Sequence, residues 1–390
     1  MNFILFDGSV RKQLLPFTFT RPVADIRVGI LTIREKWERW LGSTTSTVTE
    51  DYLSHKWPLV EMSENIMINA SFLPTPELVA QIESLEEGQA IFFDEEVVAF
   101  YTLEDQEVNF EEYLQLELSG DPLRIEHTWD IFSKNGEALT ADFELITANR
   151  NSCTIPSSNN VLAAENIFIE EGAKVEFCIL NASTGPIYIG AKTEIMEGSL
   201  IRGPFALGES SVVKMGAKIY GPTTVGPFSK VGGEITNSVI FGNSNKSHEG
   251  YLGNSVLGEW CNLGADTNTS NLKNNYAVVK LWDYETEKFA STGLQFCGLM
   301  MGDHSKCSIN TMFNTGTVVG VSANIFGSGF PRNFIPSFSW GGSGGITTYK
   351  TSKAFEVAEI VLNRRNLLFS NEDKEILEQV FEDTKKWRRE

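Results

Sequence analysis

A step of six residues runs through the second half of this chain and constrains its fold more than any other feature. Eight positions spaced by six all carry branched aliphatic residues, namely Ile189, Ile195, Ile201, Leu207, Val213, Ile219, Val225 and Val231. The same step occurs earlier and later, at Val161, Ile167, Ala173, Ile179, Met301, Cys307, Phe313, Val319 and Ile325, while Leu257 and Leu263 keep its phase in between. This period matches neither an α-helix at about 3.6 residues per turn nor a simple strand at about 2.

Such a period is typical of short strands joined by tight corners, three strands closing one triangular coil. Stacked coils lie about 4.8 Å apart, so the repeated aliphatic residues form continuous columns inside a prism. Gly and Pro cluster where corners are needed, as in IRGPFALGESS and IYGPTTVGPFS. We therefore predict a parallel β-helix of hexapeptide repeats over residues 151–340. A β-sandwich, the alternative, does not require a strict step of six.

Two interruptions break the repeat, at residues 236–256 and at about 271–298, and we predict both to be loops that leave the solenoid. Inserted loops often carry binding residues. The Pro- and Gly-rich segment after Phe330 predicts the end of the repeat. Residues 341–390 then predict a helical tail, with one helix from about Ser352 to Phe369 and a second capped by Ser370 with Asp373 at the capping-box position. We expect these helices to cover the open end of the solenoid.

Residues 1–150 show a different pattern, which predicts an α/β domain. NFILFDG and NIMINASFLP have the composition of buried strands, and AIFFDEEVVAFYTL that of a hairpin. ELVAQIES and the segment from Arg34 to Trp40 have apolar residues at helical spacing.

Composition and charge exclude several classes of function. The 51 acidic and 32 basic residues give a net charge of −19, which argues against a nucleic-acid partner. No apolar run reaches the roughly 18 residues of a membrane span, and the N-terminus lacks a secretory signal, so we expect no membrane association. The five cysteines show no CxxC spacing, which predicts neither a zinc site nor a disulfide framework and favours a cytoplasmic location.

The stretch from His248 to Tyr276, HEGYLGNSVLGEWCNLGADTNTSNLKNNY, carries the most specific motif of the chain. It resembles the acetyltransferase signature of the GlmU family, bifunctional enzymes that build UDP-N-acetylglucosamine, in which a GHLTYLGD-like segment precedes NIGAGT and an NY pair. The resemblance covers roughly residues 160–335. It implies a left-handed parallel β-helix, a homotrimer, and acetyl transfer from acetyl-CoA to an amino-sugar phosphate or nucleotide sugar.

The resemblance also implies roles for single residues. His248 takes the general-base position, where a neutral imidazole accepts a proton from the attacking amine. Tyr251 matches the sugar-phosphate tyrosine, Asn262 an acceptor-site asparagine, and Ala265 a backbone contact to the pantetheine arm. The second family asparagine falls on Asn271 by straight count and on Asn275 by the NY pair, and the sequence leaves both open.

Arg202 takes the place of the family's upstream phosphate-binding arginine, with a longer spacing to His248 than in the family. Two other positions depart from the family pattern, because Thr236 replaces a phosphate-binding lysine and Ile309 a coenzyme-contacting serine. In so acidic a protein, anionic ligands depend on local cations, for which the sequence offers Arg202, Lys230, Lys246 and Lys273.

The N-terminal segment ILFDGSVRKQLLPFTFTRPVADIRVGIL is similar to the nucleotide loop of sugar-1-phosphate nucleotidyltransferases. Gly8 matches one of the glycines of that loop, and Arg11 and Arg21 stand at the positions of its basic residues. Where that family holds Mg²⁺ with a Gly-Asp pair, this chain has Ala70 and Ser71, and serine is a poor magnesium ligand. We therefore assign no metal ligand, with Asp7 and Asp25 as alternative carboxylates, and Mg²⁺ is implied only if this domain is active.

Three functions follow in order of preference. The first is acyl transfer by the solenoid. The second is nucleotidyl transfer by the N-terminal domain, with the solenoid as a trimer scaffold. The third is a non-catalytic scaffold of the same fold.

Overall fold

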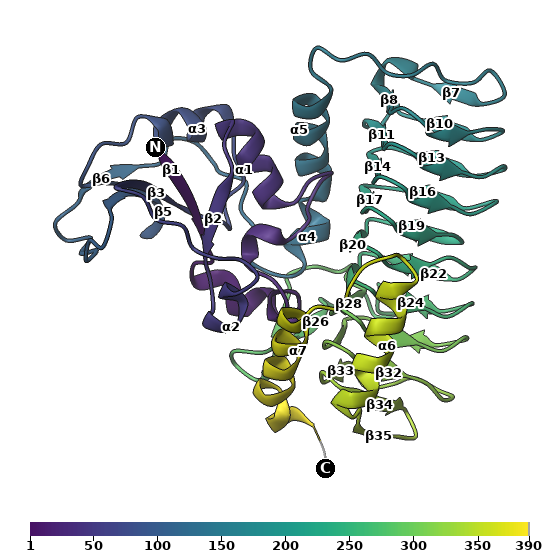
Figure 1. Cartoon of the computed structure of the whole chain (residues 1–390). Coiled ribbons are helices and arrows are strands. Elements are labelled where there is room, and N and C mark those ends of the chain that lie inside the picture. The colour runs from purple at the N-terminus through teal and green to yellow at the C-terminus, as the bar shows by residue number, and fades with distance from the viewer. Residues whose placement is uncertain (389–390) are drawn as a thin grey trace.

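The N-terminal domain is built on one mixed sheet with helices around it (Figure 1). The computed structural model describes residues 1–388 of the chain. Six strands follow the order β2-β1-β3-β5-β4-β6, with β1 parallel to β2 and β3, and β5 antiparallel to β3 and β4. Their bounds are β1 Asn2–Phe6, β2 Thr45–Val48, β3 Glu64–Asn69, β4 Gln89–Phe93, β5 Glu96–Leu103 and β6 Leu114–Glu117. The predicted strands and hairpin are confirmed.

Five α-helices belong to this domain: α1 Ile33–Leu41, α2 Asp51–Ser54, α3 Pro76–Glu83, α4 Asp130–Ser133 and α5 Asn135–Thr147. The two predicted helices correspond to α1 and α3. Helix α1 begins with a capping box, in which the Thr32 side chain accepts a hydrogen bond from the Glu35 backbone and the Glu35 carboxylate accepts one from the Thr32 backbone. Between β1 and α1 the chain forms three short 3₁₀ helices, Ser9–Leu14, Phe17–Phe19 and Val23–Asp25.

Three parallel sheets form the faces of the predicted β-helix, and one strand of each closes a coil (Figure 1). The first face contains β7 Asn160–Leu162, β10 Ile179–Asn181, β13 Leu200–Arg202, β16 Lys218–Tyr220, β19 Glu234–Thr236 and β22 Tyr251–Gly253. The second contains β8 Ile167–Ile169, β11 Ile187–Ile189, β14 Phe205–Leu207, β17 Thr223–Val225, β20 Val239–Gly242, β23 Val256–Glu259, β28 Leu299–Met301, β31 Thr317–Val319 and β33 Phe334–Ile335. The third contains β9 Lys174–Val175, β12 Glu194–Ile195, β15 Val212–Val213, β18 Lys230–Val231, β21 Asn245–Lys246, β24 Asn262–Leu263, β29 Lys306–Cys307, β32 Asn324–Ile325, β34 Ser339–Gly342 and β35 Gly345–Thr348. A further pair, β25 Asn268–Thr269 and β30 Met312–Phe313, lies beyond β22.

The eight aliphatic residues at the six-residue step all point into the solenoid, and none is more than 2% exposed. They belong to one continuous buried cluster, which confirms the columns that the step predicts. The later positions from Met301 to Ile325 are buried as well. The second coil departs from the step at its first strand, because Leu180 pairs with Val161 and is fully buried, whereas Ile179 is 42% exposed.

Residues 236–256 do not form the predicted loop. They continue the solenoid through β20, β21 and β22. Val212 pairs with Lys230, an offset of 18 residues, whereas Thr224 pairs with Val239, an offset of 15. Shorter corners therefore shift the phase of the repeat without breaking the stack of strands. The repeat also continues past Phe330, into β33 and β34.

The second interruption does leave the solenoid, and it contains an antiparallel hairpin of β26 Lys280–Asp283 and β27 Lys288–Ser291. Its aromatic residues pack against the rest of the molecule. Trp282 stacks on Phe334 with ring centroids 4.2 Å apart, and Tyr284 meets the edge of Phe19 at 5.3 Å. The hairpin therefore helps to join the solenoid to the N-terminal domain.

The two C-terminal helices, α6 Thr351–Asn363 and α7 Asn371–Asp383, lie beside the solenoid rather than over its end (Figure 1). The predicted capping box of Ser370 and Asp373 is present at the start of α7. The expectation that these helices cover the open end is wrong, because β35 folds back antiparallel onto β34 at that point. Among residues 1–388 no helix is long and apolar enough to cross a membrane.

Candidate functional site

One edge of the prism, between its third and first faces, holds several of the predicted site residues. His248 lies in the corner between β21 and β22, Ala265 in the next corner, and Ile309 in the one after that. Backbone hydrogen bonds join these corners, from Asp266 N to Glu249 O at 2.9 Å and from Asn310 N to Ala265 O at 2.8 Å. The structure therefore stacks the three positions along one edge.

The His248 imidazole is exposed, and no hydrogen bond or ion pair of this ring occurs within residues 1–388. Farther along the same edge, the surface is hollowed over about 570 Å³. The hollow is lined by Asp266, Asn268, Ser308, Ile309, Asn310, Met312 and residues 327–329. An exposed imidazole on an edge with such a hollow has the access that a general base needs.

Tyr251 and Asn271 meet on the first face beside this edge. The Asn271 amide nitrogen donates to the Tyr251 hydroxyl at 2.9 Å and to Asn254 Oδ1 at 2.8 Å. Gly253 makes this arrangement possible, because a Cβ there would lie 2.3 Å from the Tyr251 hydroxyl. Burial raises the pKa of Tyr251, so its hydroxyl stays protonated and can donate to a ligand oxygen.

The alternative asparagine, Asn275, lies farther along the insertion, where its side chain accepts from the Ala277 backbone at 3.1 Å and is exposed. Asn262 is exposed on β24, three residues before Ala265. Tyr251 and Asn271 are thus in direct contact on the first face, whereas Asn262 lies on the third face and Asn275 four residues beyond Asn271 in the insertion.

Arg202 is not brought to this cluster. It is exposed on β13, three strands before β22 in the same sheet, which corresponds to about 14 Å. Thr236, at the position of the family lysine, is 7% exposed. Of the other predicted cations, Lys230 is exposed and Lys273 donates to Val278 O at 3.4 Å.

Lys246 contradicts its predicted role as a surface cation. Only 2% of this residue is exposed, because it occupies an interior position of the solenoid. Its Nζ donates to His248 O at 2.6 Å. Burial lowers the pKa of Lys246 to about 8.

A second candidate site lies where β1 and β2 end in the N-terminal domain. A hollow of about 520 Å³ there is lined by residues 6–8, Arg11, residues 48–52 and Gln379. Gly8 has a left-handed φ of 64°, and a Cβ at this position would lie 2.9 Å from the Asn69 amide. The carboxyl ends of neighbouring parallel strands are a common place for ligands in α/β domains.

The charged groups of this second site are engaged with one another. Arg11 donates to the Asp7 carboxylate at 2.9 Å and to Thr18 O at 2.6 Å. Asp7 also accepts from Thr49 and from the Val23 backbone. Burial raises the pKa of Asp7 against the opposing effect of Arg11.

The residues present do not fit Mg²⁺. Ala70 and Ser71 are buried at the end of β3, and the Ser71 hydroxyl donates to Asn69 Oδ1 at 2.8 Å. Within residues 1–388 no three His, Cys, Asp or Glu side chains are grouped so as to hold a metal ion. Asp25, the other carboxylate considered, is paired with Arg34 at 2.7 Å.

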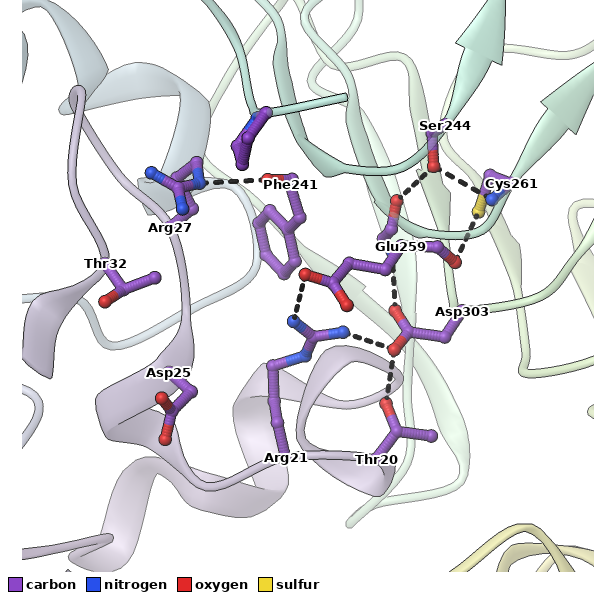
Figure 2. A network of polar contacts seen from close by, with 12 residues as sticks. Thr20, Arg21, Asp25, Arg27, Thr32, Phe241, Ser244, Glu259, Cys261 and Asp303 are labelled. Carbon is purple, nitrogen blue, oxygen red and sulfur yellow. Dashed lines mark hydrogen bonds and ion pairs between the residues drawn. The ribbon is translucent and has the colours of Figure 1, made fainter. Parts of the chain in front are cut away.

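Arg21 does not face the hollow at the ends of β1 and β2. It forms an ion pair with Asp303 of the solenoid, as Figure 2 shows, and lies 3.6 Å from Glu259. Thr20 donates to the same Asp303 carboxylate at 2.8 Å, and the Glu259 backbone donates to its other oxygen at 2.9 Å. The arginine therefore joins the two domains through a buried network. No local sequence pattern indicates that Asp303 is the partner of Arg21, because the two residues lie 282 positions apart in the chain.

The N-terminal domain matches a known protein family, and a short part of the chain is similar to curated proteins. Residues 3–151 match the family model described as sugar nucleotidyl transferase. GlmU of Methanocaldococcus jannaschii is 34% identical over 87 residues, which is 22% of this chain and 21% of that protein. A bifunctional sugar-1-phosphate nucleotidylyltransferase/acetyltransferase of Sulfurisphaera tokodaii is 33% identical over 100 residues, 25% of this chain and 24% of that protein. The matched segment thus spans between a fifth and a quarter of the length of these curated relatives.

Among solved structures, Arabidopsis UDP-N-acetylglucosamine acyltransferase aligns with 60% of this chain and 99% of its own, at 16% identity and a TM-score of 0.26. The polySia-specific acetyltransferase NeuO aligns with 49% of this chain and 84% of its own, at 11% identity and a TM-score of 0.24. Residues 3–151 therefore form a domain of the sugar nucleotidyl transferase family, in a chain that has distant relatives among the bifunctional GlmU proteins.

Proposed function

We propose that the solenoid transfers an acetyl group from acetyl-CoA to the amine of an amino-sugar phosphate or nucleotide sugar. The observation that carries this proposal is the stack of His248, Ala265 and Ile309 along one edge with a hollow beside its far end. The resemblance of this stretch to the GlmU acetyltransferase signature supports the same assignment.

In the proposed reaction, the acceptor amine attacks the thioester carbonyl of acetyl-CoA and forms a C–N bond. His248 accepts the proton that the amine loses. The tetrahedral intermediate then expels the coenzyme A thiolate, which breaks the C–S bond and takes up a proton. A positioned base of this kind contributes about 10²- to 10⁴-fold to the rate.

Tyr251 and Asn271 supply the polar groups for the acceptor. Their hydroxyl and amide lie together on the first face, where a sugar or phosphate oxygen can accept from the Tyr251 hydroxyl. Asn262, on the other side of the edge, offers a further amide to the acceptor. Arg202 belongs to this proposal only as a more distant cation of the same face.

We also propose a homotrimer in which the first face is covered by a second copy. The outward positions of this face include four exposed apolar or aromatic residues, Leu162, Ile179, Leu200 and Tyr220. Exposed apolar patches of this kind mark protein interfaces.

The test is His248→Ala, assayed by release of free coenzyme A with a panel of amino-sugar phosphates and amino nucleotide sugars. We expect kcat to fall about 10²- to 10⁴-fold, because the base is lost. The free energy of unfolding should stay unchanged, because the side chain is exposed. His55→Ala is the matched control, since His55 is also exposed but lies in the N-terminal domain. Unchanged turnover in the His248 variant would exclude it as the base.

Nucleotidyl transfer is the second candidate function, favoured by the family match of residues 3–151 and by the hollow at the ends of β1 and β2. Pyrophosphate release from a nucleoside triphosphate and a sugar-1-phosphate measures it directly. Loss of that release in Arg11→Ala would support a nucleotide site at this hollow.

A further inference from the structure

The corner that carries His248 is held from inside the solenoid by Lys246, a cation in an otherwise largely apolar column. Most interior positions of this column are apolar, and Val231, one coil before, pairs with Lys246. Leu263 follows in the next coil. A lysine in such a column is unexpected, because burial of an ammonium group is unfavourable unless the group is hydrogen bonded.

Three corners of the same edge are closed by a small polar side chain, whereas Ala217 and Gly233 stand at the equivalent position in the two corners before that of His248. Ser199, Thr267 and Thr311 each donate from their hydroxyl to the backbone oxygen three residues earlier, at 2.7 to 2.8 Å. These bonds fix the tight turn of each corner from its inner side.

The His248 corner lacks such a hydroxyl. Gly250 stands at the equivalent position, and a Cβ there would lie 2.2 Å from Thr267 O, so a larger residue is excluded. This corner has a different internal hydrogen bond, in which Lys246 Nζ donates to His248 O at 2.6 Å. The donor thus acts on the residue whose side chain is exposed at the edge.

From this geometry we infer that Lys246 is a positioning residue, which holds the backbone of His248 so that its imidazole faces the acceptor. The inference rests on the proposed acetyl transfer for its catalytic part. The claim that Lys246 holds the backbone of this corner in place does not depend on the proposed function.

The test uses Lys246→Met, which keeps the length and apolar body of the side chain and removes the donor. We expect kcat to fall at least 10-fold while KM for acetyl-CoA changes less than 3-fold, because binding groups stay in place and only the base is displaced. The variant should fold, since an apolar residue suits an interior column. Lys306→Met is the matched control, because Lys306 also donates to a backbone oxygen, His304 O, at 2.8 Å, at a different corner of the solenoid.

Hydrogen exchange provides a readout that does not depend on activity. The amides of Asp266 and Glu234 donate to the Glu249 and Gly250 carbonyls of the His248 corner. We expect both amides to exchange at least 10-fold faster in Lys246→Met and at the wild-type rate in Lys306→Met. Unchanged exchange of both amides would overturn the inference.

A second variant separates hydrogen bonding from folding. Lys246→Gln retains a neutral donor, and we expect it to restore at least part of kcat and of the slow exchange relative to Lys246→Met. A wild-type kcat in Lys246→Met would overturn the positioning role. If the wild-type protein transfers no acetyl group to any acceptor, the proposed function fails, and the exchange rates alone decide whether Lys246 fixes the corner.

Discussion

Several polar residues at outward positions of the solenoid are exposed, whereas three cations of the N-terminal domain are buried in ion pairs. His248, Arg202 and Asn262 are exposed on the solenoid. Arg11, Arg21 and Lys36 of the N-terminal domain are at most 8% exposed, and each is paired with a carboxylate.

The difference follows from how each region is stabilised. A coil of the solenoid receives its core contacts and backbone hydrogen bonds from the coils on either side, so outward corner residues are free to serve a ligand. The loop between β1 and α1 has no such support. It is packed between two domains, and its cations stabilise that packing: Arg27 donates to Phe241 O at 2.9 Å, and the Arg21 guanidinium lies 5.2 Å from the Phe241 ring.

We expect the largest loss of stability when the buried ion pair of Arg21 and Asp303 is broken. Asp303→Ala leaves the Arg21 guanidinium buried, with the nearest remaining carboxylate, Glu259, 3.6 Å away. Removing one partner of a buried ion pair costs about 3 to 5 kcal/mol, and we expect a loss of about 3 kcal/mol in the free energy of unfolding, measured by urea denaturation. Arg202→Ala, on the exposed side, should change it by less than about 0.5 kcal/mol. Similar losses in the two variants would contradict the comparison.

The second prediction concerns the first coils of the solenoid, where neighbouring residues have opposite environments. Leu180 is fully buried and Ile179 is 42% exposed. Leu180→Ala should lower the free energy of unfolding by about 2 to 4 kcal/mol, because it leaves a cavity in the column. Ile179→Ala should lower it by less than about 0.5 kcal/mol. The reverse order would show that the six-residue step continues without a shift into this coil.

These two residues also show what could be predicted from the sequence. A strict step of six identifies columns wherever each corner has the same length, and there the structure agrees at every position from Ile189 to Val231. The step fails where a corner gains or loses residues, since the interior position then moves along the chain. Ile179 and the segment 236–256 are of this kind: Leu180 pairs with Val161 at an offset of 19 residues, and Val239 pairs with Thr224 at an offset of 15.

The candidate site was predictable to the extent that it is local in sequence. His248, Tyr251 and Ala265 lie within one motif, and the stacking of coils brings their corners together. Arg21 illustrates the opposite case, because its partner Asp303 is on a different domain and no local pattern indicates such a pair. Lys246 lies 15 residues after Val231, its partner in the previous coil, and is therefore out of phase with the six-residue step. A cation in an acidic protein suggested a surface role instead.

The smallest expected effect is a change in how stability depends on pH, and it concerns a buried histidine at a corner of the solenoid. His248 is exposed, whereas His304 lies between β28 and β29, stacked against Trp260 with ring centroids 6.2 Å apart. Burial lowers the pKa of His304 to about 3, with further effects of Lys306, Asp303, Asp373 and Lys56. The folded protein therefore keeps this ring neutral at pH values where the unfolded chain, with a pKa near 6.5, binds a proton.

The unfolded state thus takes up more protons than the folded state below about pH 6.5, so the free energy of unfolding falls as the pH decreases. Between pH 6.5 and 5.5, above the titration of most carboxylates, this histidine should account for a loss of about 1 kcal/mol. His304→Gln, which stays neutral in both states, should lose correspondingly less than the wild type over the same interval, as measured by urea denaturation at the two pH values. If the free energy of unfolding falls equally in His304→Gln and in the wild type, the His304 imidazole is protonated in the folded protein.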